Sequence, residues 1–97
     1  MILVERKKDS ILITGHALYA DYGKDIVCSA VSSIVITTIN GIIGIDNNAI
    51  KYEESNGIKI QVVKKDNITL KLIDNMMMLL KELSLKYPKN IKIKEGV

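Results

Sequence analysis

Residues 15–32 read GHALYADYGKDIVCSAVS and join a predicted strand to a long uncharged run. This stretch holds the only histidine of the chain, His16, and its only cysteine, Cys28. A nucleophilic thiol needs a proton acceptor within hydrogen-bond reach and a positive field that favours the thiolate. The stretch therefore supplies a candidate nucleophile and a candidate base.

The run that follows Asp25 contains no charge between residues 26 and 45, which is long enough to cross a bilayer. Its polar residues, however, share one side of a helical wheel and its apolar residues the other. This amphipathic spacing favours a buried helix over residues 25–43, with no membrane span, although the β-branched residues 34–39 leave the propensity ambiguous. Asp25 is a candidate N-cap of this helix and Gly44 a candidate C′ residue.

Strand-like segments flank this helix on both sides. They cover residues 2–6, 10–14, 49–54, 58–63 and 89–95, and Asn56-Gly57 between the third and fourth predicts a hairpin. A second helix begins at Asp66 or Asn67 and ends before Pro88. The predicted order is ββαββαβ. We therefore expect an α+β fold of two layers, a mixed β-sheet and two main helices, in a single domain over residues 1–97.

Length and composition narrow the functional classes. Ninety-seven residues, 47% of them hydrophobic and 26% charged, suit one globular domain and exclude a disordered chain. The net charge of +3 is scattered, without a basic stripe or interleaved aromatic residues, so direct nucleic-acid binding is not expected.

One cysteine cannot form an internal disulfide, which fits a reducing compartment such as the cytoplasm. One cysteine with one histidine is also too few for a structural zinc site. The N-terminal residues do not resemble a signal peptide.

If Asp25 caps the helix, Cys28 is its third residue. The first turn of a helix carries unpaired N–H groups and the positive end of the dipole, which favour a thiolate and can hold an oxyanion. His16 would then act as general base and protonate the leaving group. Asp25 has two competing roles, capping the helix or orienting His16. The alternative is that neither residue is catalytic: Cys28 is then a small buried side chain and His16 a structural residue.

Residues 17–24 show no sustained periodicity and are expected to form a loop over the site. Gly15 and Gly23 bracket this loop as candidate hinges, and Tyr19 and Tyr22 lie within it.

The residues GHA at 15–17, Gly23, DIVC at 25–28 and the following SAVS resemble the ribosomal-processing cysteine protease family, Prp (YsxB-like). The resemblance implies a cytoplasmic bacterial endopeptidase that removes a short N-terminal extension from a large-subunit ribosomal protein, L-twenty-seven. It also implies a homodimer and the absence of any metal or cofactor.

On this resemblance His16 and Cys28 match the catalytic dyad, and Asp25 matches the acidic residue near it. Gly15 and Gly23 match the ends of a mobile loop. The family cuts after aromatic residues, which implies an apolar pocket beside Cys28. Tyr19 and Tyr22 are candidates to line the pocket or are exposed loop residues, and Ser32, at the end of the motif, is a candidate substrate-binding residue.

A second hypothesis comes from another functional class. The chain would be a non-catalytic, dimeric binding module associated with the ribosome. In that case Cys28 would serve packing alone, and the basic excess would contact RNA.

Overall fold

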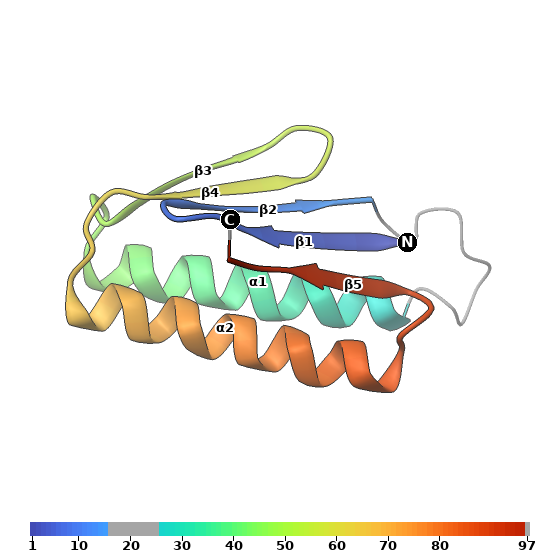
Figure 1. The fold of residues 1–97 in the computed structure, drawn as a ribbon. Helices are drawn as coiled ribbons and strands as arrows, with labels where there is room; N and C mark the ends of the chain where they lie inside the picture. The colour runs from blue at the N-terminus through green and yellow to red at the C-terminus, as the bar shows by residue number, and fades with distance from the viewer. Residues whose placement is uncertain (16–25, 97) are drawn as a thin grey trace.

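The computed structural model describes residues 1–15 and 26–96 and has the predicted order ββαββαβ. The elements are β1 (Ile2–Arg6), β2 (Ser10–Thr14), α1 (Ile26–Ile45), β3 (Ile50–Glu54), β4 (Ile58–Val62), α2 (Asn67–Lys86) and β5 (Ile91–Lys94). Figure 1 shows both helices under one face of a single sheet. The predicted α+β class with two layers is confirmed.

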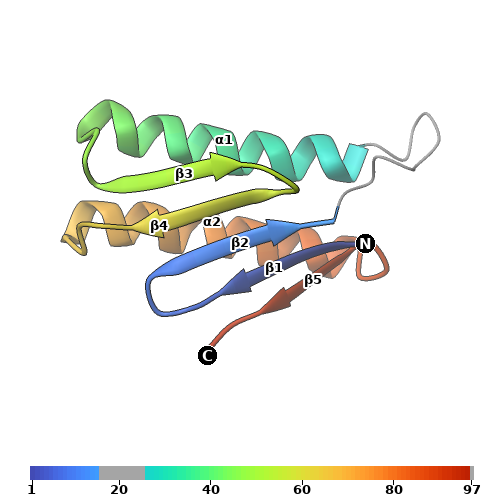
Figure 2. The ribbon, with the colours of Figure 1, turned by 90° about the horizontal axis from the view of Figure 1, so that it is seen from above.

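The sheet has the strand order β3-β4-β2-β1-β5, so β2 lies at its centre (Figure 2). The pairs β1–β2, β2–β4 and β3–β4 are antiparallel, and β1–β5 is parallel, which makes the sheet mixed as predicted. Strands β2 and β3 therefore run in the same direction with β4 between them. Likewise β4 and β5 run in the same direction with β2 and β1 between them.

This topology explains why both helices cover the same face. Each helix connects two parallel strands, and such crossovers are right-handed in almost all proteins. The α1 connection moves toward one edge of the sheet and the α2 connection toward the other, from strands of opposite direction. Reversing the direction of movement along the sheet changes the face on which a right-handed crossover places its helix, and so does reversing the direction of the starting strand. Because α1 and α2 differ in both respects, the two helices lie on the same face.

The core lies between this helical layer and the sheet. Helix α1 contributes five buried residues at helical spacing, namely Val27, Val31, Val35, Ile39 and Ile42. Helix α2 contributes Thr69, Ile73, Met76, Met77 and Leu80. Two of the three consecutive methionines thus fill the core, as a chain without Phe or Trp requires, whereas Met78 is 51% exposed. The predicted apolar face of α1 is confirmed.

The end of α1 differs from the prediction. The helix continues through Gly44 to Ile45, and the Asp46 N–H still donates to the Ile42 carbonyl at 2.8 Å. The assignment of Gly44 as the C′ residue is therefore wrong. Nothing lies within 4 Å of a Cβ built at Gly41 or Gly44, so no close packing accounts for either glycine. The predicted N-cap, Asp25, lies outside the described residues.

Helix α1 is long and apolar enough to cross a membrane by length and composition. Its large apolar side chains are nevertheless used by the core, because Ile34, Ile36 and Ile43 pack against the buried residues and only Ile26 and Ile45 are exposed. Helix α1 thus turns its apolar face to the sheet and its polar face outward, which is the pattern of a core helix.

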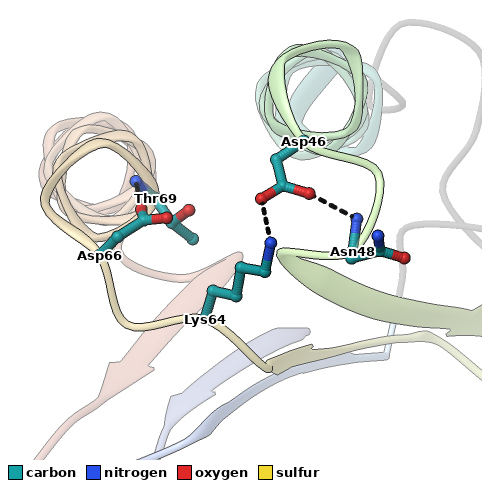
Figure 3. A network of polar contacts seen from close by, with 5 residues as sticks. All are labelled: Asp46, Asn48, Lys64, Asp66 and Thr69. Atoms are coloured by element: carbon teal, nitrogen blue, oxygen red, sulfur yellow. Dashed lines mark hydrogen bonds and ion pairs between the residues drawn. The ribbon is translucent and has the colours of Figure 1, made fainter.

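The start of α2 is fixed by a polar network (Figure 3). Asp66 is the N-cap, and its Oδ1 accepts a hydrogen bond from the Thr69 backbone N–H at 2.8 Å. This bond holds the pKa of Asp66 below its usual value of 3.8. Beside it, the Lys64 ammonium donates to the Asp46 carboxylate at 2.7 Å, which lowers the pKa of Asp46 and raises that of Lys64. The exposed pair ties the end of α1 to the segment before α2.

Two glycines allow backbone segments to approach at one end of the sheet. Gly15 has φ +68°, and a Cβ there would lie 2.1 Å from the Met1 carbonyl oxygen. Gly57 has φ +128°, and its Cβ would lie 2.4 Å from the Ile13 carbonyl oxygen. Asn56, at φ 54°, completes the predicted Asn-Gly turn between β3 and β4. No other residue type fits either glycine position without displacing backbone.

Replacing Asp66 by Ala is expected to lower the melting temperature at pH 7, because the Thr69 N–H loses its acceptor. Since the folded state lowers the pKa of Asp66, this stabilisation is complete above about pH 4 and is lost as the pH falls through the folded-state value. The melting temperatures of wild type and Asp66→Ala should therefore converge in acid. Asp66→Asn, which keeps a capping oxygen, should melt close to wild type at pH 7. Equal melting of wild type and Asp66→Ala at pH 7 would contradict the capping role.

Gly57→Ala is expected to destabilise the fold by about 1–3 kcal/mol, because the new methyl group meets the Ile13 carbonyl in a strained backbone conformation. Gly96→Ala is the matched control, since Gly96 also has a positive φ of +84° but has nothing within 4 Å of its Cβ position. Urea denaturation measures both. Equal effects of the two substitutions would mean that the close approach at Gly57 has no energetic weight.

Candidate functional site

A cavity of about 190 Å³ opens at the end of the sheet where the two glycines lie. Four chain segments meet around it: the start of β1, the end of β2, the first turns of α1 and the β3–β4 turn. Its lining residues are Ile2, Ile13, Gly15, Cys28, Val31, Ser32, Gly57 and Ile58. We call this cavity the Cys28 pocket.

Strand register explains why these segments meet. In the antiparallel ladders Leu3 pairs with Thr14 and Ile13 pairs with Ile58. The start of β1, the end of β2 and the start of β4 therefore lie at one end of the sheet. The first turn of α1 lies at the same end, since Cys28 and Gly15 line one pocket.

Cys28 is the third residue of α1 and lies in its first turn. The first N–H groups of a helix have no partner within the helix and carry the positive end of its dipole. The Cys28 side chain is free and half-buried, and it packs against the core while also lining the pocket. A sulfur in this position is reachable from the cavity and stands next to backbone donors that have no partner within the helix.

The walls of the Cys28 pocket are apolar. Ile2, Ile13 and Val31 are buried core residues that also face the cavity, and none of the described residues that line it carries a charge. Ser32 lies one helical turn after Cys28 and adds a hydroxyl to the rim. A cavity of this kind accepts an apolar side chain and strengthens the electrostatic interactions of groups placed at its edge.

Three predicted site residues therefore lie together: Gly15, Cys28 and Ser32. The other five, His16, Tyr19, Tyr22, Gly23 and Asp25, lie outside the described residues. Their predicted roles as base, loop residues, hinge and acidic partner remain predictions.

Sequence reasoning missed Gly57 and Ile58, which also line the Cys28 pocket. The Asn-Gly signal locates a hairpin turn in the chain but does not say which strand lies next to it. The missing information is the pairing of β4 with β2, which brings this turn to the end of the strand that leads to His16.

Cys28 is the only thiol of the chain, so no other hollow among residues 1–15 and 26–96 contains one. A larger hollow of about 510 Å³ lies along the β3 edge and is lined by side chains such as Tyr52, Lys59 and Gln61, without a thiol or histidine. Within residues 1–15 and 26–96, no three His, Cys, Asp or Glu side chains gather in the way that a metal ion requires. Cys28 therefore marks the candidate active site of the described structure.

Comparison with known proteins identifies the family of this chain. A family model described as cysteine protease Prp matches residues 1–92. The ribosomal processing cysteine protease Prp of Staphylococcus aureus is 31% identical over 93 residues, covering 92% of this chain and 88% of that protein. The corresponding protein of Mycoplasma genitalium is 30% identical over 105 residues, covering 98% of this chain and 96% of that protein.

The fold agrees as well. A crystal structure of the Staphylococcus aureus ribosomal processing protease Prp, in complex with a covalently linked product peptide, matches with a TM-score of 0.87 at 23% identity. The match covers 99% of this chain and 100% of that one. With a thiol in the first turn of α1, an apolar pocket beside it and a family match along nearly its whole length, this chain belongs to the Prp family of cysteine proteases.

Proposed function

We propose that this protein is a cysteine endopeptidase that removes the N-terminal extension of the bacterial ribosomal protein L-twenty-seven, using Cys28 and His16 as a dyad. One observation carries the proposal. Cys28 and Gly15 line the same pocket, and His16 is bonded to Gly15. Because neighbouring α-carbons are about 3.8 Å apart, the position of Gly15 supports His16 as the proposed partner of the thiol.

In the proposed reaction the Cys28 thiolate attacks the scissile carbonyl carbon. The unpaired N–H groups of the first turn of α1 stabilise the oxyanion that forms. His16, protonated by the thiol, donates its proton to the leaving amine, which departs and leaves a thioester on Cys28. Water then attacks the thioester with His16 as base, which releases the carboxylate and restores the thiol. The covalent product complex of the Staphylococcus aureus relative supports a peptide carried on the protein.

Asp25 precedes the first residue of α1, where a carboxylate either caps the helix or orients the His16 ring. Both roles are compatible with a start of α1 at Ile26. Tyr19, Tyr22 and Gly23 belong to the segment between Gly15 and α1, and we propose that this segment covers the bound peptide.

Cleavage of a peptide that spans the extension and the mature N-terminus of the ribosomal protein tests the proposal. We expect a single cut by wild type, abolished in Cys28→Ala and slowed by about 10²–10⁴-fold in His16→Ala, the usual range for a lost general base. Asp25→Asn should cut more slowly while keeping its fold. Mass spectrometry of the products and circular dichroism of each variant provide the readouts.

Met78→Ala, on the exposed side of α2, is the control and should cleave like wild type. Cleavage by the Cys28→Ala protein at the wild-type rate would exclude the thiol mechanism. If Asp25→Asn is fully active, the carboxylate serves the helix alone or has no role in the reaction.

We propose further that the protein is a homodimer. The support comes from the outer side of α1, where Ser29, Ser33, Thr37, Asn40, Gly41 and Gly44 are exposed and no charged residue occurs. Surface helices usually carry charge on their outer face, and depletion of charge is typical of the centre of an interface. A second copy of this chain is the proposed occupant of that surface.

Sedimentation velocity at micromolar concentration tests the dimer. Thr37→Glu places a charge in the centre of this surface and is expected to give a monomer, because burying an unpaired carboxylate is costly. Asn75→Glu, at an exposed position of α2, is the matched control and should sediment like wild type. A Thr37→Glu protein that remains dimeric would place the interface elsewhere, and a monomeric wild type would exclude the dimer.

The proposed location is the cytoplasm, where a single unpaired thiol stays reduced. The proposal includes no direct contact with nucleic acid. In its support, Arg6, Lys64 and Lys65 are engaged in ion pairs with Asp74, Asp46 and Asp9. These pairs leave the basic excess dispersed over the surface.

A further inference from the structure

Strand β3 forms one edge of the sheet, and no described strand pairs with its outer side. The Ser55 N–H donates to the Gly57 carbonyl at 3.0 Å, so these two residues form a hydrogen-bonded pair of the β3–β4 ladder. Hydrogen-bonded pairs alternate with non-bonded pairs along an antiparallel ladder. Ile50, Tyr52 and Glu54 therefore direct their backbone N–H and C=O groups away from β4, toward the edge of the sheet.

The hollow of about 510 Å³ lies along this edge, and we call it the β3 hollow. Ile50 and Tyr52 line it from the strand, and Ile43 and Asn47 line it from the end of α1 and the residues just after it. Seen from above, α1 follows the β3 side of the sheet, whereas α2 lies under the other strands (Figure 2). A peptide placed beside β3 would therefore rest on α1, as the existing strands rest on the helical layer.

The β3 hollow and the Cys28 pocket lie on the same flank of α1. Cys28 and Ser32 line the pocket, and Ile43 and Asn47 line the hollow. At 3.6 residues per turn, these positions lie within about 100° of one another around the helix axis, and half-buried Ile36 lies between them. From Cys28 to Ile43 the helix rises about 22 Å, the length of about seven extended residues.

This flank offers a continuous path for a peptide. Helix α1 contains no charged residue, so a segment of either charge can follow it. A peptide whose scissile carbonyl lies at the Cys28 sulfur, and which continues along α1 in an extended conformation, reaches β3 without leaving the surface. The continuity of the two hollows thus identifies the peptide substrate as the occupant of the β3 edge.

We propose that the β3 edge is a second binding site for the peptide substrate, where a segment about seven residues from the cleaved bond adds to the sheet as a further strand. Main-chain hydrogen bonds to the outward groups of β3 hold the segment. Its side chains alternate, so those turned toward α1 meet Ile43 and Tyr52, and those turned away meet Lys51 and Glu53. This inference rests on the proposed function for the identity of the ligand.

The test uses two peptides of the ribosomal protein sequence, a long one with ten residues on each side of the cleaved bond and a short one with four. We expect wild type to prefer the long peptide by about tenfold or more in kcat/KM, as one or two net hydrogen bonds supply. Tyr52→Pro removes an outward N–H and blocks strand addition while sparing the β3–β4 ladder. It should bring the ratio toward one.

Ile93→Pro is the matched control, because it makes the same change on the opposite edge strand. The Ile2 N–H donates to the Asn90 carbonyl at 2.7 Å, and in a parallel ladder of this register the Ile93 N–H points away from β1. This variant should keep the wild-type ratio. If Tyr52→Pro does not fold by circular dichroism, Glu54→Pro removes the next outward N–H and should lower the ratio in the same way.

The inference is overturned if wild type cleaves both peptides equally well, if the folded β3 variants keep the wild-type ratio, or if Ile93→Pro lowers it equally. Sedimentation velocity addresses another occupant, a second copy of this chain. A Tyr52→Pro protein that is monomeric where wild type is dimeric, with an unchanged peptide ratio, would assign the edge to that copy and overturn the inference.

Binding to Cys28→Ser protein separates this inference from the proposed function. A wild type that cleaves neither peptide would refute the proposed function. Tighter binding of the long peptide that Tyr52→Pro abolishes would still support the site at β3. Equal or undetectable binding of both peptides would refute that site.

Discussion

The site depends on one constraint, the position of β2 between two antiparallel partners. Pairing with β1 and β4 fixes both sides of β2, and the pairs Leu3–Thr14 and Ile13–Ile58 bring three strand ends to one place. Gly15 and Gly57 permit the backbones to approach there. Each has a positive φ, and a Cβ at either position would collide with the backbone of a neighbouring segment. A shift of register by one residue would turn Ile13 away from the core and take Ile58 from the pocket.

The uncharged sequence of α1 supplies core residues, the candidate nucleophile and a polar outer side. Val27 and Val31 anchor its first turns in the core on either side of Cys28, so the thiol is held by packing at a defined place. Catalytic groups gain from such positioning, because freedom lost on folding need not be lost again when substrate binds. The opposite side of the helix stays polar but carries no charge, which leaves it suited to contact with another protein surface.

Much of the fold could be predicted because its signals are local. Alternation in β1, β2 and β4, the Asn56-Gly57 turn and the Asp66 cap each depend on a few neighbouring residues. The end of α1 could not be placed correctly, since a glycine marks a helix end only when the backbone there becomes left-handed. Gly44 has no positive φ, and the chain turns instead at Asp46, whose carboxylate accepts the Asn48 N–H at 2.9 Å. Cys28 could be singled out from composition and resemblance. The part of the pocket lined by Gly57 and Ile58 could not, because it depends on the pairing of β2 with β4, whose paired residues are more than forty positions apart in sequence.

The central claim is that the Cys28 sulfur is a positioned nucleophile at the edge of an apolar pocket. Intact-protein mass spectrometry with a peptidyl chloromethyl ketone bearing Phe next to the reactive group tests it directly, because the chain has a single cysteine. The account predicts one adduct, formed at least about a hundredfold faster than the reaction of the same reagent with free cysteine, because good positioning of the reacting groups can supply considerably more than this factor. It further predicts that urea unfolding abolishes this advantage. Labelling of the folded protein at the rate of free cysteine, or no faster than that of the unfolded chain, would contradict it.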